Sequence, residues 1–275
     1  MTPFVFFGTD EFAVEVLEQL KADSLLPALI ITTEGKSSHR GKLLASPVET
    51  WAKESHLPFS YFLKANSYQL FIVASYGKIL SRTTLDMAKH GTLNIHPSLL
   101  PKYRGATPLQ SAILNGDTET GVSIMLLDEQ MDRGPLLISK TYDLSPITSF
   151  ESLRDDLAKL GAQALAKILP DYLAGKIKPT KQDHNAATYT KKIIKNLGQL
   201  NLSDSPEEND RKIRALNPNP GTYFIDDNGK RIKILKAHLE PAQLGRSASK
   251  LVIDRVVPEN KKEMAWKSYL TGIKK

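Results

Sequence analysis

Apolar residues in the first half of the chain gather in five short runs, at positions 3–7, 28–32, 70–75, 91–95 and 122–127. Between them, apolar positions recur with helical spacing, as at Phe12, Val16, Leu17 and Leu20. Short runs that are apolar on both faces are typical of parallel strands covered by helices. The pattern therefore predicts an α/β fold with a Rossmann-like open, mostly parallel sheet and helices on both faces.

The second half of the chain changes character near residue 175. A helical stripe of leucine and isoleucine over 153–168 ends there, and residues 175–190 (GKIKPTKQDHNAATYT) have no periodicity. A helix-like segment follows at 206–216, and strand-like runs follow at 222–225, 231–237 and 251–257. We expect a first domain over 1–178, a linker over 179–190, and a small OB-like β-barrel domain over 191–275.

Composition removes several classes of protein. The sequence has no run of 18 apolar residues and no basic stretch before its first apolar segment, so neither a membrane span nor a signal peptide is expected. We therefore expect a cytoplasmic protein. It contains no cysteine, which excludes disulfides, thiolate nucleophiles and cysteine-based metal sites.

Charge is divided unevenly along the chain. Residues 1–180 contain 18 Lys/Arg and 19 Asp/Glu, whereas residues 181–275 contain 19 Lys/Arg and 11 Asp/Glu. A cationic module beside a nearly neutral one indicates a polyanionic partner, since contacts with phosphates release counterions. The same excess would also be seen in a lysine-rich solvated surface without a partner.

Two polar side chains end the fourth apolar run. Asn94 and His96 lie two residues apart in the sequence GTLNIHPSLLPKYRG, at 91–105. Alternate residues of a strand point to the same face, so these two side chains are expected to lie next to each other. An isolated Asn-x-His pair at a strand end is usually a structural hydrogen-bonded pair.

The pair suits acyl transfer to an amine, which needs a route for a proton and a donor for the oxyanion of the tetrahedral intermediate. His96 can take the proton and Asn94 can donate to the oxyanion. A carboxylate could orient the imidazole and stabilise its cation. Asp132, in the loop after the 122–127 run, is the candidate, and Asp128 is the alternative.

The sequence contains no motif for a dinucleotide, a nucleoside triphosphate or a metal ion. Gly8 follows the first apolar run, but the sequence has neither the glycine pattern of a dinucleotide site nor a P-loop. No cluster of His, Asp and Glu has metal-ligand spacing, so no metal is expected.

The string from Asn94 to Gly105, with Thr120-Gly-Val122 and the segment LDEQMDRG at 127–134, resembles the signature of the folate-dependent formyltransferases. The resemblance implies that Asn94, His96 and Asp132 are catalytic. It also implies that the strip Ser98, Leu99, Leu100 and Pro101 binds the folate. Tyr76 and Ile79, in the segment ASYGKIL at 74–80, are weaker candidates for the same pocket.

The segments ATYTKK (187–192), IRALNPNPG (213–221) and VPENKKEMAW (257–266) resemble the C-terminal motifs of the family members that act on methionyl-tRNA. That resemblance implies a first domain that is catalytic and a basic second domain that binds tRNA. Arg40 and Lys42, in a loop shorter than is usual, and Lys191 and Lys192 become candidate tRNA contacts. Asn219 and Leu202 stand where the family usually has tryptophan.

The resemblance implies transfer of the formyl group of 10-formyltetrahydrofolate, as co-substrate, to the α-amine of methionyl initiator tRNA, by a monomer in the bacterial cytoplasm. A sugar-nucleotide N-formyltransferase would share the folate half and use another acceptor. A catalytically silent RNA-binding protein of the same fold is the alternative from another class.

Overall fold

The computed structural model describes residues 2–37, 43–241 and 249–273. The chain divides into two compact units. Unit 1 comprises Met1–Pro108, Glu119–Asp143 and Ser152–Thr190, and unit 2 comprises Leu109–Thr118, Leu144–Glu151 and Lys191–Lys275. The segment 179–190, expected to be a linker, groups with unit 1, and the predicted domain boundaries stay a prediction.

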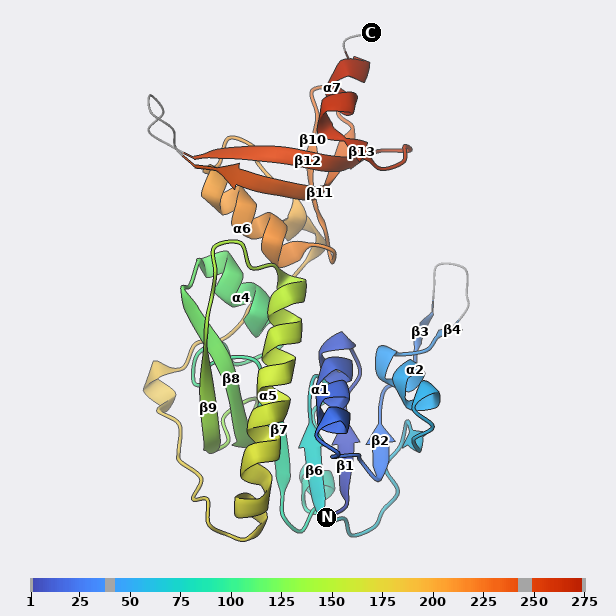
Figure 1. Ribbon diagram of the computed structural model, residues 1–275, viewed down its shortest axis with the longest axis vertical. Coiled ribbons are helices and arrows are strands. Elements are labelled where there is room, and N and C mark those ends of the chain that lie inside the picture. The colour runs from blue at the N-terminus through green and yellow to red at the C-terminus, as the bar shows by residue number, and fades with distance from the viewer. Residues whose placement is uncertain (1, 38–42, 242–248, 274–275) are drawn as a thin grey trace. The chain divides into compact units, whose positions relative to one another are not determined.

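A seven-stranded sheet forms the centre of unit 1 (Figure 1). Its order is β5 (Phe59–Ser60), β2 (Leu29–Ile31), β1 (Phe4–Phe7), β6 (Leu70–Val73), β7 (Thr92–His96), β8 (Glu119–Leu126) and β9 (Leu136–Asp143). The first five strands are parallel, and β8 and β9 extend the sheet antiparallel. The predicted open, mostly parallel sheet is confirmed.

Helices α1 (Glu11–Ala22) and α5 (Phe150–Leu173) cover one face of this sheet. Asp10 caps α1, because its side chain accepts a hydrogen bond from the backbone N–H of Ala13. α5 packs closely on β7 and β8: a Cβ added at Gly161 would lie 2.5 Å from Cγ2 of Ile95. Most of the predicted stripe on α5 is buried, including Leu153, Leu157 and Leu165, whereas Leu160 is only partly buried.

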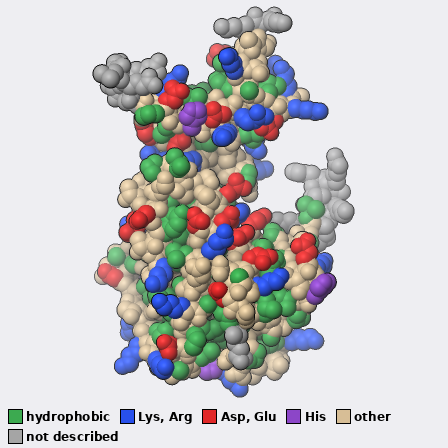
Figure 2. Space-filling model, in the orientation of Figure 1, with side chains coloured by type: hydrophobic (Ala, Val, Ile, Leu, Met, Phe, Trp, Pro, Cys, Tyr) green, Lys and Arg blue, Asp and Glu red, His purple; other side chains and the backbone are tan. Residues whose placement is uncertain are grey.

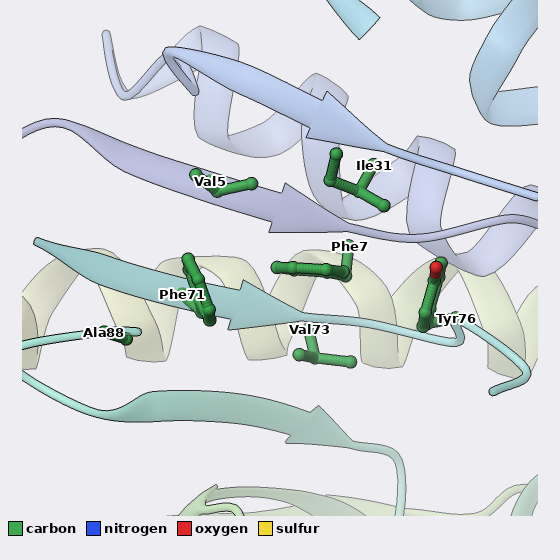
Figure 3. Close-up of a cluster of buried hydrophobic side chains, with 7 residues drawn as sticks. All are labelled: Val5, Phe7, Ile31, Phe71, Val73, Tyr76 and Ala88. Atoms are coloured by element: carbon green, nitrogen blue, oxygen red, sulfur yellow. The ribbon is translucent and has the colours of Figure 1, made fainter. Parts of the chain in front are cut away.

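The opposite face of the sheet carries a second apolar layer (Figure 3). Its buried members are Val5, Phe7, Ile31, Phe71, Val73, Tyr76 and Ala88. Leu63 and Tyr68, which precede β6, and Leu80 and Met87, which flank the short helix α3 (Arg82–Leu85), pack against it. Val73 pairs in register with Asn94, so the candidate catalytic strand end continues this same face.

The remaining elements of the first half are short. Helix α2 (Pro47–Glu54) follows the two-stranded pair β3 (Lys36–Ser37) and β4 (Leu43–Leu44). Helix α4 (Pro108–Asn115) lies between β7 and β8 in sequence, and the 3-10 helix η1 (His184–Ala186) lies in the 179–190 segment.

Unit 2 is built around a four-stranded antiparallel sheet, in the order β10 (Thr222–Ile225), β11 (Arg231–Glu240), β12 (Lys250–Pro258) and β13 (Met264–Ala265). The 3-10 helix η2 (Lys195–Gly198), α6 (Pro206–Leu216) and α7 (Trp266–Ile273) accompany it. Its core contains Leu200, Ile213, Phe224, Ile232, Ile234, Val256 and Tyr269. The predicted helix and strands are confirmed. Among the described strands, β10 and β13 are the edges, and no pairing joins them into a closed barrel.

In the part of the chain that the structure describes, no helix is both long enough and apolar enough to cross a bilayer.

Candidate active site

The predicted pair lies at the carboxyl end of β7, where ligands bind in open α/β sheets. Asn94 and His96 are 8% and 5% exposed. Ile95, which lies between them, contacts α5 at Gly161. Because alternate residues of a strand point to opposite faces, the side chains of Asn94 and His96 lie on the face of the sheet opposite α5. Thus the period-two argument from the sequence places them as the structure does.

The imidazole of His96 is held by a hydrogen bond at Nε2. Nε2 lies 3.0 Å from the carbonyl oxygen of Tyr103, and since a carbonyl can only accept, Nε2–H is the donor. The other nitrogen, Nδ1, lies 3.7 Å from Oδ1 of Asp132, which is ion-pair range and beyond a hydrogen bond. The imidazole is therefore oriented by a backbone carbonyl and has a carboxylate near its second nitrogen.

Asp132 is anchored on two sides. Its Oδ2 accepts a hydrogen bond of 2.7 Å from the backbone N–H of Gly105, and its backbone carbonyl accepts one of 3.0 Å from Nε2 of Gln182. Its φ of 53° is in the left-handed region, which is uncommon for a residue other than glycine. Such conformations persist where surrounding contacts enforce them.

The structure distinguishes the two aspartates that the sequence left open. Asp128 is exposed, and its Oδ1 accepts a local hydrogen bond of 2.7 Å from the backbone N–H of Gln130. Asp132, not Asp128, lies beside His96.

The Asn94 carboxamide is available to a ligand. Among the described residues, none forms a hydrogen bond with this side chain, although it is mostly buried. An amide N–H donor at a strand end, next to the imidazole, is an arrangement that can stabilise an oxyanion.

The strip Ser98–Pro101 is held by internal hydrogen bonds. Ser98 is fully buried, and its hydroxyl donates to the carbonyl of Lys102 over 2.6 Å. The Ser123 hydroxyl donates to the Ser98 carbonyl over 2.8 Å and accepts from the N–H of Leu100 over 3.1 Å. Leu99 and Pro101 are partly exposed, whereas Leu100 is 6% exposed. Leu99, Pro101 and backbone groups are therefore the parts of the strip that a ligand can reach.

The two weaker pocket candidates differ in environment. Tyr76 is buried, its ring meets that of Phe7 edge-on at 5.3 Å, and burial raises the pKa of its phenol. Ile79 is 81% exposed. The structure thus places Tyr76 in the apolar layer and leaves the Ile79 side chain at the surface.

The candidate tRNA contacts lie in two separate segments of the sequence. Arg40 and Lys42 lie outside the described residues. Lys191 and Lys192 are exposed at the start of the last segment of unit 2.

Four residues next to the candidate catalytic side chains carried no predicted role: Tyr103, Arg104, Gly105 and Gln182. The first three lie in the signature string, but the string gives no indication of which groups they contact. Gln182 lies in the segment expected to be a linker, so no local signal marked it.

Within the described residues no group of three or more His, Asp or Glu side chains could hold a metal ion.

Comparison with known families and proteins gives one consistent result. Residues 3–169 match the model of the formyl transferase family, and residues 192–274 match that of the formyl transferase C-terminal domain. The methionyl-tRNA formyltransferase of Carboxydothermus hydrogenoformans is 36% identical over 98% of this chain and 96% of its own length. That of Chloroflexus aurantiacus has the same identity and coverage, and that of Geobacter sulfurreducens is 31% identical over 98% of this chain and 93% of its own length.

Two solved structures have a similar fold. WlaRD, a sugar 3N-formyl transferase solved with dTDP and 5-N-formyl-THF, has a TM-score of 0.69 at 19% identity, covering 95% of this chain and 99% of its own. HypX from Aquifex aeolicus, solved with tetrahydrofolic acid, has a TM-score of 0.67 at 16% identity, covering 98% of this chain and 47% of its own.

Proposed function

Since this chain belongs to the formyl transferase family, we propose that it transfers the formyl group of 10-formyltetrahydrofolate to the α-amine of methionine carried by initiator tRNA. The observation that carries the proposal is the likeness to methionyl-tRNA formyltransferases along 98% of the chain. The likeness extends through both units, and the catalytic-type side chains converge in unit 1.

The reaction exchanges one carbon–nitrogen bond for another. The un-ionised α-amine attacks the formyl carbon, a C–N bond forms, and a tetrahedral intermediate carries the negative charge on the former carbonyl oxygen. Its collapse breaks the bond between the formyl carbon and N10 of the folate. The amine loses one proton and N10 gains one, so the products are the N-formylated methionyl-tRNA and tetrahydrofolate.

His96 moves the proton. With Nε2–H donated to the Tyr103 carbonyl, the lone pair of the neutral ring is on Nδ1. A proton taken up at Nδ1 gives an imidazolium whose two N–H groups face the Tyr103 carbonyl and the Asp132 carboxylate. Both neighbours are hydrogen-bond acceptors, so each N–H of the imidazolium has an acceptor to face.

Asn94 donates to the oxyanion. Its carboxamide has no competing partner among the described residues, and it projects from the same face of β7 as the imidazole. A fixed donor aimed at a developing charge contributes more than the same group in water because it needs no reorganisation.

The folate lies against the strip Ser98–Pro101, with Tyr76 and Ile79 near the same pocket. Leu99 and Pro101 offer partly exposed apolar surface, and the backbone is held in place by Ser123. This arrangement suits a flat heterocycle that needs apolar faces and a few backbone hydrogen bonds.

Unit 2 binds the tRNA backbone, together with Arg40, Lys42, Lys191 and Lys192. On the face shown in Figure 2, lysine and arginine side chains are spread over the region of β11 and β12 among acidic ones. Arg231, Lys236, Lys250 and Arg255 are exposed on these strands. Spread cations suit sequence-independent contact with phosphates.

Formyl transfer from labelled 10-formyltetrahydrofolate tests the proposal, with methionyl initiator tRNA, methionyl elongator tRNA and an amino-sugar nucleotide as parallel acceptors. We expect transfer to the initiator alone. Transfer only to the sugar would support the sugar-nucleotide alternative, and no transfer to any acceptor would support a silent RNA-binding protein.

A further inference from the structure

A buried glutamine joins the 179–190 segment to the catalytic loop. Gln182 is 6% exposed, and its Nε2 donates to the carbonyls of Asp132 and Gly134 over 3.0 and 2.7 Å. Its Oε1 accepts from Nη2 and Nε of Arg104 over 2.6 and 3.2 Å. One carboxamide thus uses its two donors on the loop that carries Asp132 and its acceptor on a guanidinium.

The guanidinium fixes which way this carboxamide points. Arg104 is 1% exposed, and its other partners are Nδ1 of His184 at 3.0 Å and the Tyr189 hydroxyl at 3.3 Å. Among the described residues no carboxylate forms an ion pair with it. Because a guanidinium only donates, it requires Oε1 of Gln182 on its side, which turns Nε2 toward the catalytic loop.

The turn Tyr103–Gly105 contacts both members of the His96–Asp132 pair. The Tyr103 carbonyl accepts from His96, and the Gly105 N–H donates to the Asp132 carboxylate. The Arg104 side chain reaches the backbone of Asp132 through Gln182. Since Nδ1 of His96 and Oδ1 of Asp132 are 3.7 Å apart, with no hydrogen bond between them, these third parties set their separation.

The backbone of Asp132 gives Gln182 a specific task. A left-handed φ of 53° costs free energy in a residue that has a Cβ, so the conformation depends on contacts that oppose its relaxation. The hydrogen bond from Gln182 to the Asp132 carbonyl is such a contact.

We propose that Gln182, oriented by Arg104, is a positioning residue that holds Asp132 beside His96 for formyl transfer. The inference rests on the proposed function for its reaction and goes beyond it, because neither residue touches the reacting atoms. Without Gln182, the loop keeps the Gly105 contact to the carboxylate but loses the bonds that fix its backbone.

The test compares Gln182→Glu with Asn185→Asp. The first substitution keeps the size of the side chain and its contact with Arg104 but removes the donor to the loop. The second makes the same amide-to-carboxylate change at an exposed position three residues on. We expect Gln182→Glu to lower kcat by about 10- to 100-fold, the size of loss found when a hydrogen-bond partner that orients a metal ligand is removed. KM for folate and tRNA should stay within about twofold, and Asn185→Asp should match the wild type.

A double-mutant cycle separates positioning from general structural damage. If Gln182 acts through Asp132, then Gln182→Glu should cost less than about threefold in kcat when Asp132 is already Asn. An equal loss in both backgrounds would overturn the inference. So would a kcat within threefold of the wild type for Gln182→Glu alone.

A readout without turnover keeps this inference distinct from the proposed function. The ¹⁵N shifts of the His96 ring report the proton on Nε2 and the environment of Nδ1. We expect Gln182→Glu to change them and Asn185→Asp to leave them unchanged, whichever acceptor the wild-type enzyme uses. Unchanged His96 shifts in Gln182→Glu would overturn the positioning role, whereas a wild-type enzyme inactive on methionyl-tRNA would overturn only the proposed acceptor.

Discussion

In the candidate active site of unit 1, formed by Asn94, His96 and Asp132, the polar side chains are largely buried, and His96 and Asp132 are held by hydrogen bonds of 3.0 and 2.7 Å. In unit 2, the core cluster is apolar and most lysine and arginine side chains are exposed, although the buried Asp210 forms an ion pair with Arg214. The activity of a buried site depends on the positions of its polar groups, because a polar group enclosed in the protein cannot replace a missing hydrogen-bond partner with water. The affinity of a charged surface for a polyanion depends on the sum of its charges, and dissolved salt screens those charges. Substitutions in the two regions should therefore differ in size and in salt dependence.

The largest effect should come from Asp132→Asn. The change preserves shape but removes the charge that faces Nδ1 of His96, and carboxylates in such positions are worth about 10⁴-fold in kcat. We expect the variant to fold, as judged by its thermal midpoint, and to lose nearly all turnover.

Asp128→Asn is the matched control for that change. Asp128 lies in the same loop, is exposed, and contacts only the local turn in the hydrogen bonds described, so its variant should keep wild-type activity. More than about a tenth of wild-type activity in Asp132→Asn would contradict the role given to the carboxylate, since that loss is far smaller than this chemistry predicts.

Asn94→Ala should have the next largest effect. Removal of one oxyanion donor typically costs about 10²- to 10³-fold in kcat. Because the Asn94 amide has no partner in the described part of the protein, its removal should leave stability nearly unchanged. Steady-state kinetics would check this, and a rise in KM with an unchanged kcat would show ground-state binding instead.

The binding of tRNA should depend on salt and the binding of folate should not. We expect the affinity for tRNA to fall steeply between low and physiological salt, while folate binding changes little, since only tRNA binding is dominated by phosphate contacts.

Lys191→Ala with Lys192→Ala should sharpen this contrast. Removing a cation that binds a phosphate reduces the slope of log affinity against log salt by about 1. We therefore expect the double variant to have a shallower slope for tRNA than the wild type, by about 1 for each lysine that binds a phosphate. A filter-binding titration would measure it, with folate affinity in the same variant as the control. Equal salt slopes for the two ligands would contradict the view that phosphate contacts dominate the binding of tRNA alone.

The smallest effect should be a pH dependence of the stability of unit 2, caused by a tyrosine in its core. Burial, followed by a hydrogen bond of 2.6 Å to Asp226, raises the pKa of Tyr269 to about 12. A folded-state pKa above the usual value of about 10 gives stability that is fully present below pH 10 and is lost as the pH rises toward 12.

The Tyr269→Phe variant should lack the pH-dependent stability that the phenol of Tyr269 contributes. Chemical unfolding of both proteins at pH 9 and at pH 11 would check it: the wild type should lose stability across this interval by more than the variant does. Equal losses would show that Tyr269 titrates normally.

Local sequence patterns determined much of this protein. Runs of apolar residues identified β1, β2, β6, β7 and β8 of the unit 1 sheet but not the edge strands β5 and β9, which lack such runs. The two-residue period of a strand placed Asn94 beside His96. These features depend on neighbours in the chain, so spacing alone reveals them. The functional expectation came from the motif string and not from spacing.

Only the tertiary structure decided which groups complete the site. It placed Asp132, and not Asp128, beside His96, and it enclosed the side chains of Ser98 and Leu100. It also joined Arg104 to Gln182 across 78 residues of sequence, from a segment whose composition predicted a linker. Such contacts form where separate segments pack together, and because the energy of a buried hydrogen bond depends on its partner and not on its sequence neighbours, no local pattern in the chain encodes them.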